Sequence, residues 1–198
     1  MKIFSKTIFA CAVALASTSF AATAEMAPDF TLRSSQGTDI KLSDQRGKFV
    51  VLEWWNHECP FVKKHYDSQN MQGLQKKWTA QGVQWFTISS SAAGKQGFVG
   101  PRAANRIYSE QEMASTAILH DPKGVVGRLY QAQTTPAMYI INPTGELIYR
   151  GAIDSIPSVD AADLPKATNY IDQVLTEATA GKPVTVASTS SYGCGVKY

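Results

Sequence analysis

The sequence has few cysteines, little excess of either charge and no long apolar run beyond its first residues. Its 198 residues include three cysteines, and 19 Lys and Arg stand against 16 Asp and Glu. So balanced a charge gives no case for nucleic acid as a partner, and no like-charge block or repeat suggests a charged tail or a repeat array. The length suits one domain with a proper core and excludes a small scaffold that depends on disulfides.

The first 24 residues have the pattern of a secretory signal peptide. Lys2 and Lys6 precede an apolar run over 7–16, no acidic residue occurs before Glu25, and small residues at 22–24 form the expected cleavage site. The run is too short and wrongly flanked to span a membrane. We therefore expect 1–24 to be removed and the protein to be periplasmic, without a stable membrane anchor.

Cleavage would discard Cys11 and leave Cys59 and Cys194 in 174 residues (198 − 24). In an oxidising compartment, two cysteines are either one structural bridge or one redox pair. We expect one domain over 25–181, followed by a polar tail over 182–198 that carries Cys194.

Apolar patterning predicts an α/β fold in which a central sheet has helices on both faces and is preceded by an N-terminal β-hairpin. Predicted strands cover 29–33, 38–42, 49–55, 83–89, 117–120, 137–142 and 146–150. Predicted helices cover 60–80, 102–113, 124–131 and 164–179. The segment 90–101 is rich in Ser, Ala and Gly and is expected to be a long loop.

Cys59 directly follows a buried strand and precedes a helix that starts at Pro60. A sulfur there lies beside unpaired N–H groups and the positive end of the helix dipole, and both favour the reactive thiolate. Corners at the carboxyl edge of a sheet are also where α/β folds place their sites. The alternative is that Cys59 is a small buried apolar residue.

Four segments together carry a resemblance to a known family. They are Val50-Val51-Leu52-Glu53-Trp54-Trp55, Cys59-Pro60-Phe61-Val62-Lys63, Thr135-Pro136, and 142–151 beginning Asn142-Pro143-Thr144-Gly145-Glu146. From about residue 27 to 181 the chain resembles the exported redoxin and peroxiredoxin-like (AhpC/TSA-type) branch of the thioredoxin superfamily. The resemblance implies a thioredoxin-like fold with a mixed sheet, redox chemistry at cysteine, and no cofactor or metal.

The resemblance also implies roles for individual residues. Pro136 should be a cis-proline beside the reactive sulfur, and Thr135 should offer its backbone to an extended substrate. Glu53 should be a buried acid with a raised pKa that passes a proton to or from the resolving thiol. As an alternative, Glu53 caps the strand edge or pairs with a lysine.

We place three residues around Cys59 on the substrate-binding surface: Pro60, Phe61 and Trp55. Trp55 has an alternative role in the core.

Two departures from the family patterns bear on the mechanism. Val62 stands where a dithiol thioredoxin has its second cysteine, so the helix supplies no resolving thiol. Asn56 and Leu52 stand where peroxiredoxins have a threonine or serine and a proline, which weakens the case for a peroxidase.

Cys194 is the remaining candidate for the resolving thiol. It lies between two glycines, which give the backbone freedom to approach another sulfur. The tail can extend roughly 43–47 Å beyond Gly181 at about 3.3–3.6 Å per residue, so reach permits pairing with Cys59. We expect such a bond to be easily reduced and reduction to release the tail with little loss of stability.

The leading hypothesis is a thiol-disulfide oxidoreductase that exchanges electrons between a protein or small-molecule disulfide or thiol and an unknown electron donor or acceptor. One alternative is a thiol peroxidase in which Cys59 becomes a sulfenic acid that Cys194 condenses with. Another is a copper-binding chaperone that uses both thiols and one of His57, His65 or His120. In a fourth reading, the Cys59–Cys194 bond is a static staple.

Overall fold

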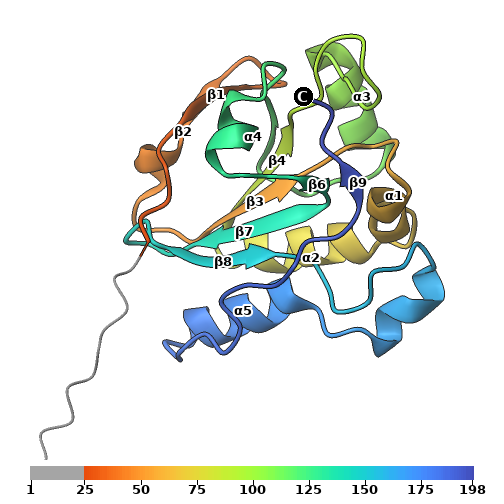
Figure 1. The fold of residues 1–198 in the computed structure, drawn as a ribbon. Helices are drawn as coiled ribbons and strands as arrows, with labels where there is room; N and C mark the ends of the chain where they lie inside the picture. Colours follow the sequence, from red (N-terminus) through yellow and green to blue (C-terminus); the bar gives the residue numbers. More distant parts are fainter. Residues whose placement is uncertain (1–24) are drawn as a thin grey trace, which may run out of the picture.

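The computed structural model describes residues 25–198, so the predicted signal peptide lies outside the described residues. A seven-stranded sheet has the order β2-β1-β5-β4-β3-β7-β8 (Figure 1). Its strands are β1 Thr31–Ser34, β2 Asp39–Lys41, β3 Val50–Trp54, β4 Gln84–Ser89, β5 Ala117–His120, β7 Ala137–Ile141 and β8 Leu147–Gly151. Strands β3, β4 and β5 run parallel, and β1–β2, β1–β5, β3–β7 and β7–β8 pair antiparallel. The predicted mixed sheet and its opening hairpin are therefore confirmed.

Helices cover both faces of this sheet, as predicted (Figure 1). The α-helices are α1 Pro60–Asp67, α2 Asn70–Thr79, α3 Pro101–Glu110, α4 Val125–Leu129 and α5 Tyr170–Thr179, and the 3-10 helices are η1 Leu42–Gln45 and η2 Ala161–Lys166. Helices α1, α2, α3 and α5 contribute to the core on one face, and α4 and η1 to the core on the other. Strand β3 is buried along its whole length because its side chains alternate between these two cores.

The single helix predicted over 60–80 is wrong, because the structure has two helices with a break between them. Gln69 takes a left-handed conformation with φ 61°, which ends the run of α-helical backbone. The Ser68 hydroxyl donates to the Lys64 carbonyl at 2.6 Å, so it takes up an acceptor at the end of α1. A serine that bonds back to the preceding turn is common where helices bend or end.

The helix predicted over 164–179 also begins too early. Residues 161–166 form the 3-10 helix η2, which contains Pro165. Helix α5 starts only after Asn169, whose side chain accepts a hydrogen bond from the Asp172 N–H at 2.9 Å. Proline removes a backbone donor and asparagine is a favoured N-cap, so the chain forms two separate helices although the apolar spacing continues across both.

The segment 182–198 lies against the domain along its length (Figure 1). It runs from the end of α5 past β8, where the Arg150 N–H donates to the Ala187 carbonyl at 3.2 Å. It then forms the short strand β9 Cys194–Gly195, which pairs antiparallel with β6 Thr134–Thr135 in a separate two-stranded sheet. No helix within 25–198 is long and apolar enough to cross a membrane.

Candidate active site

Cys59 occupies the corner between β3 and α1. It is the N-cap of α1, with Pro60 at the first helical position, and its carbonyl accepts the N–H groups of Val62 and Lys63 at 3.0 and 2.9 Å. Its side chain is fully buried, with 0% of the residue exposed. The corner therefore places the sulfur beside the first N–H groups of the helix, as the sequence predicts.

The segment at the end of β6 contacts the sulfur of Cys59. The Thr135-Pro136 peptide bond is cis, as predicted, and Cys59 Sγ lies 3.1 Å from the Thr135 carbonyl oxygen. Thr135 ends β6, and Pro136 alone separates it from β7, the strand that pairs with β3. The pairing of β3 with β7 thus brings residues 76 positions apart into contact.

The C-terminal tail brings the second thiol to this place. Cys194 is the register partner of Thr135 in the β6–β9 pair, and both cysteines are free thiols. The approach is close at Gly193, where an added Cβ would lie 2.1 Å from the Thr135 carbonyl oxygen. Gly193 also has φ 134°, a conformation that glycine adopts readily.

The two thiols have opposite pKa shifts. Burial raises the pKa of Cys59, but hydrogen bonds from the Cys194 side chain and the Val62 N–H outweigh it, and the pKa is lowered. Burial, its hydrogen bond to Cys59 and the charge of Cys59 raise the pKa of Cys194 to about 11. Of the two sulfurs, Cys59 is therefore the one that becomes a thiolate first.

Contacts on both sides of Cys194 hold the tail in place. The Tyr192 hydroxyl donates to Asp154 Oδ1 at 2.5 Å, and its ring packs edge-on against Phe61 at 5.8 Å between centroids. Beyond β9, the Tyr198 hydroxyl donates to the Ala132 carbonyl at 2.5 Å. These contacts hold the tail while both thiols are free, which does not support the expectation that reduction releases it.

A buried charge cluster supports the Tyr192 contact. Lys64 Nζ and His65 Nε2 lie 3.4 and 3.8 Å from Asp154 Oδ2, and all three side chains are almost fully buried. Burial lowers the pKa of His65 to about 4, with Asp154 opposing the shift, so His65 is neutral at neutral pH. Lys64 and His65 directly follow the segment that carries the family resemblance, but nothing in the sequence points to Asp154 as their partner.

Glu53 is buried on β3 and has a raised pKa, as predicted. Burial raises this pKa against the hydrogen bonds of four donors. The donors are Tyr66 Oη at 2.7 Å, Trp85 Nε1 at 2.8 Å, Gln75 Nε2 at 3.2 Å and Thr87 Oγ1 at 3.3 Å. Within the described chain Glu53 forms no ion pair with a lysine, and no hydrogen bond joins it to either thiol.

The three residues assigned to the substrate surface lie in different surroundings. Pro60 is exposed and Phe61 is half-buried beside the tail. Trp55 is only 1% exposed and belongs to the same core as Cys59, so it has little surface to offer a substrate. Its ring lies 5.4 Å from that of His57, whose pKa is lowered by burial.

The histidines considered for copper do not gather around the thiols. His65 is buried with its Nε2 3.8 Å from Asp154 Oδ2, and His120 ends β5. Among residues 25–198 no group of three or more His, Cys, Asp or Glu is placed to hold a metal ion. The arrangement gives the copper hypothesis no support.

Comparisons with known proteins point to one family. Residues 23–150 match the AhpC/TSA family. "Thiol-disulfide oxidoreductase ResA" of Bacillus subtilis (strain 168) is 25% identical over 122 residues, which are 62% of this chain and 63% of ResA. The match thus spans slightly less than two thirds of that relative.

Solved structures give the same result for the fold. An uncharacterized conserved protein from Geobacillus kaustophilus has a TM-score of 0.75 at 25% identity, over 88% of this chain and 91% of its own. A putative thiol:disulfide interchange protein DsbE from Chlorobium tepidum has a TM-score of 0.50 at 26% identity, over 64% and 82%. The fold is thioredoxin-like, as the resemblance implied.

Proposed function

Because this chain belongs to the AhpC/TSA family, we propose that it is a periplasmic thiol-disulfide oxidoreductase with Cys59 as nucleophile and Cys194 as resolving thiol. The observation that carries the proposal is the β6–β9 pair, which sets Cys194 opposite Thr135, the residue whose carbonyl contacts Cys59 Sγ. The opposite pKa shifts of the two thiols support the division of roles, since the nucleophile must be the thiolate. The name of the ResA relative indicates the same class of reaction.

The reaction consists of two exchanges of sulfur partners. The Cys59 thiolate attacks one sulfur of a substrate disulfide, the substrate S–S bond breaks, and the other substrate sulfur leaves as a thiolate that takes up a proton. Cys194 then loses its proton and attacks Cys59 Sγ, which releases the second substrate sulfur and forms the Cys59–Cys194 bond. The substrate gains two electrons and the protein loses two, and the reverse sequence oxidises a substrate dithiol.

Substrate access requires the tail to move. Cys59 has no exposed surface, and β9 already lies along Thr135, where the resemblance places an extended substrate. The contacts of Tyr192 and Tyr198 that hold the tail are noncovalent, so β9 can leave and return without a chemical step. In this proposal Cys194 withdraws for the first exchange and comes back for the second.

The periplasmic location is proposed from the charged, apolar and small-residue order of residues 1–24. The proposed partners are a protein or small-molecule disulfide or thiol and an electron donor or acceptor, still unknown, that restores the starting redox state. Thiols and disulfides carry the electrons, so the proposed cycle uses no cofactor.

Trapping tests the proposal. A Cys194→Ser variant expressed in its own compartment should accumulate mixed disulfides through Cys59, because the second exchange is blocked. The matched control is Cys59→Ser, which keeps Cys194 and should trap nothing. Equal trapping by both variants, or none by either, would overturn the assignment of Cys59 as nucleophile and Cys194 as resolving thiol.

A further inference from the structure

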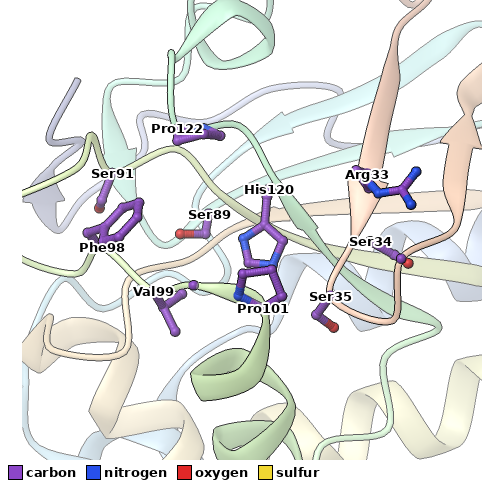
Figure 2. A pocket seen from close by; sticks show the side chains of 12 residues that line it. Arg33, Ser34, Ser35, Ser89, Ser91, Phe98, Val99, Pro101, His120 and Pro122 are labelled. Atoms are coloured by element: carbon purple, nitrogen blue, oxygen red, sulfur yellow. The ribbon is translucent and has the colours of Figure 1, made fainter.

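A cavity of about 280 Å³ lies at the carboxyl ends of β4 and β5, apart from the cysteines (Figure 2). It is enclosed by the turn between β1 and β2, the start of α3, and the residues that follow β4 and β5. Its volume is near the lower limit of small-molecule sites, which run from about 300 to 1,000 Å³. Crevices outside the carboxyl ends of strands are where α/β folds bind ligands.

A row of polar side chains crosses the sheet at this cavity. His120 of β5 is the register partner of both Arg33 on β1 and Ser89 on β4. Directly opposed residues of neighbouring strands project from the same face, and all three line the cavity. In the view of Figure 2 the His120 ring lies between Ser89 and the side chains of Ser34, at the end of β1, and Ser35.

Two buried polar atoms at the cavity have no hydrogen-bond partner among the described residues. Ser35 is 6% exposed, and its Oγ is unpaired although its N–H and carbonyl are bound to Ile118 and Asn105. His120 Nε2 is likewise buried and unpaired. A buried polar atom without a partner is destabilising, so these two atoms indicate a ligand that supplies their partner.

The start of α3 also lies at the cavity. Gly100 and Pro101 line the cavity, and no side chain caps the first turn of this ten-residue helix. No acidic residue lies in that first turn, so the positive end of the helix dipole is not compensated locally. Pro101 has no N–H to donate, so it is this dipole that favours an anionic group.

The other residues that line the cavity indicate the chemistry of the rest of the ligand. Phe98, Val99, Pro101 and Pro122 make most of the cavity apolar, and no Asp or Glu lines it. Arg33 also lines the cavity. Its exposed Nη1 lies 2.9 Å from Asp39 Oδ1 in an ion pair, and other donors of the guanidinium remain free. We propose that this cavity binds a small organic monocarboxylate whose carboxylate meets Ser35 and His120 and whose apolar body packs on Phe98 and Val99.

The cavity shares one loop with the thiol site but is independent of the proposed redox function. Residues 90–100 contribute Ser91, Phe98 and Val99 to the cavity, while the Gly97 N–H in the same loop donates to Glu58 Oε2 at 2.8 Å. Glu58 directly precedes Cys59. A ligand would therefore bind one strand away from the nucleophile, and its binding does not require either cysteine.

Titration of the mature chain with sodium benzoate and sodium hexanoate, followed by ¹H–¹⁵N NMR, tests this proposal. Saturable shifts are expected at the amides of Ser35, Ser89 and His120. Ser35→Ala and His120→Gln should each weaken binding by about tenfold, the loss expected for a hydrogen bond to a charged group. Ser109→Ala on the exposed side of α3 and His57→Gln are the matched controls and should leave the affinity unchanged.

Three results would overturn the proposal. Shifts that never saturate with either acid would show that the cavity does not bind a monocarboxylate. Equal affinity for neutral benzamide would exclude recognition of the negative charge. Unchanged binding by the Ser35 and His120 variants would place the ligand elsewhere. Ser35→Ala removes only an unpaired hydroxyl, so the spectrum of this variant should be that of a folded chain. The Cys59→Ser chain should bind as the wild type does, which separates this result from failure of the redox proposal.

Discussion

The reactivity of Cys59 depends on the thiol beside it. The hydrogen bond from the Cys194 side chain is the strongest of the contacts that lower the pKa of Cys59. A buried sulfur without that donor loses part of its preference for the thiolate, since burial alone raises its pKa. The tail therefore changes the chemistry of the nucleophile as well as its accessibility.

The first prediction follows from this contact. In Cys194→Ala the pKa of Cys59 should rise, and the midpoint of its alkylation by iodoacetamide should move to higher pH. Cys194→Ser keeps a hydroxyl donor and should shift the midpoint less. A midpoint that is unchanged in Cys194→Ala would show that the helix start alone sets the pKa.

The second prediction concerns Glu53. Its folded-state pKa lies above the ordinary value of 4.5, so the folded state binds the proton more tightly than the unfolded state does. Stability is therefore lost as pH rises from about 4.5 towards the folded-state pKa, by at most about 1.4 kcal/mol per pH unit. Glu53→Gln lacks this loss, so the difference in unfolding free energy between the two proteins should change in the variant's favour as pH rises. Parallel pH profiles in urea unfolding would contradict it.

At the scale of elements, β9 is the segment on which the proposed chemistry depends. Its position is fixed by the contact of Gly193 with the Thr135 carbonyl and by the hydrogen bond from Tyr192 to Asp154. The Val196 N–H donates to the Gln133 carbonyl at 2.9 Å, so its hydrogen exchange reports whether the tail is docked.

The third prediction is that Gly193→Ala undocks the tail. The new Cβ would lie 2.1 Å from backbone oxygen, and overpacking of this kind costs about 1–3 kcal/mol. Hydrogen exchange at Val196 should then be faster by about tenfold, since 1.4 kcal/mol corresponds to that factor. Gly195→Ala is the control, because its Cβ would meet only the Gln133 oxygen at 4.0 Å. Equal exchange in both variants would argue against a close fit at Gly193.

The fourth prediction concerns Tyr192→Phe, which removes the hydroxyl bound to Asp154. A hydrogen bond to a charged group contributes about 1.5–3 kcal/mol, so exchange at Val196 should again be faster by about tenfold or more. Formation of the Cys59–Cys194 bond under mild oxidation should slow in parallel. Tyr170→Phe is the control, since the described contacts of Tyr170 include ring packing on Tyr149 and no bond of its hydroxyl. If the two variants behave alike, the Asp154 contact does not hold the tail.

The elements predicted from the sequence are those with a strong local pattern. The continuous apolar run over 49–55 and the Pro-Thr-Gly turn at 143–145 identified β3 and the β7–β8 hairpin. Strand β9 could not be predicted, because the tail is small and polar and its partner lies 59 residues earlier in the chain. Tyr192 and Tyr198 were the available signal, as large aromatic residues in such a tail need a surface to pack on.

At the scale of the whole molecule, the tail contributes more to the two cores than the sequence suggests. The sequence predicts a domain over 25–181 and a tail that contributes little to stability, but Val184 and Val186 pack on one core and Val196 on the other. The pair of thiols was predicted because only two cysteines follow the signal pattern. The contacts that dock the tail could not be predicted because they join its residues to parts of the chain that are distant in sequence.

The fifth prediction separates the tail's packing from its disulfide chemistry. Under reducing conditions, Cys194→Ser should unfold in urea close to the wild type. Truncation after Gly181 should cost on the order of 3 kcal/mol, because it exposes apolar surface on both cores. A truncated chain as stable as the wild type would show that the tail does not contribute to the stability of the fold.

In the proposed mechanism, the pairing of β9 with β6 also makes a substrate strand and the tail compete for one backbone edge. One competitor is tethered and is present at an effective concentration on the order of millimolar, as for short flexible links. A free substrate at lower concentration must bind at Thr135 more tightly than β9 does. Otherwise its disulfide must react with the thiolate quickly, while β9 is displaced. The affinity of residues 192–198 for the domain therefore sets a threshold that selects substrates before any sulfur chemistry begins.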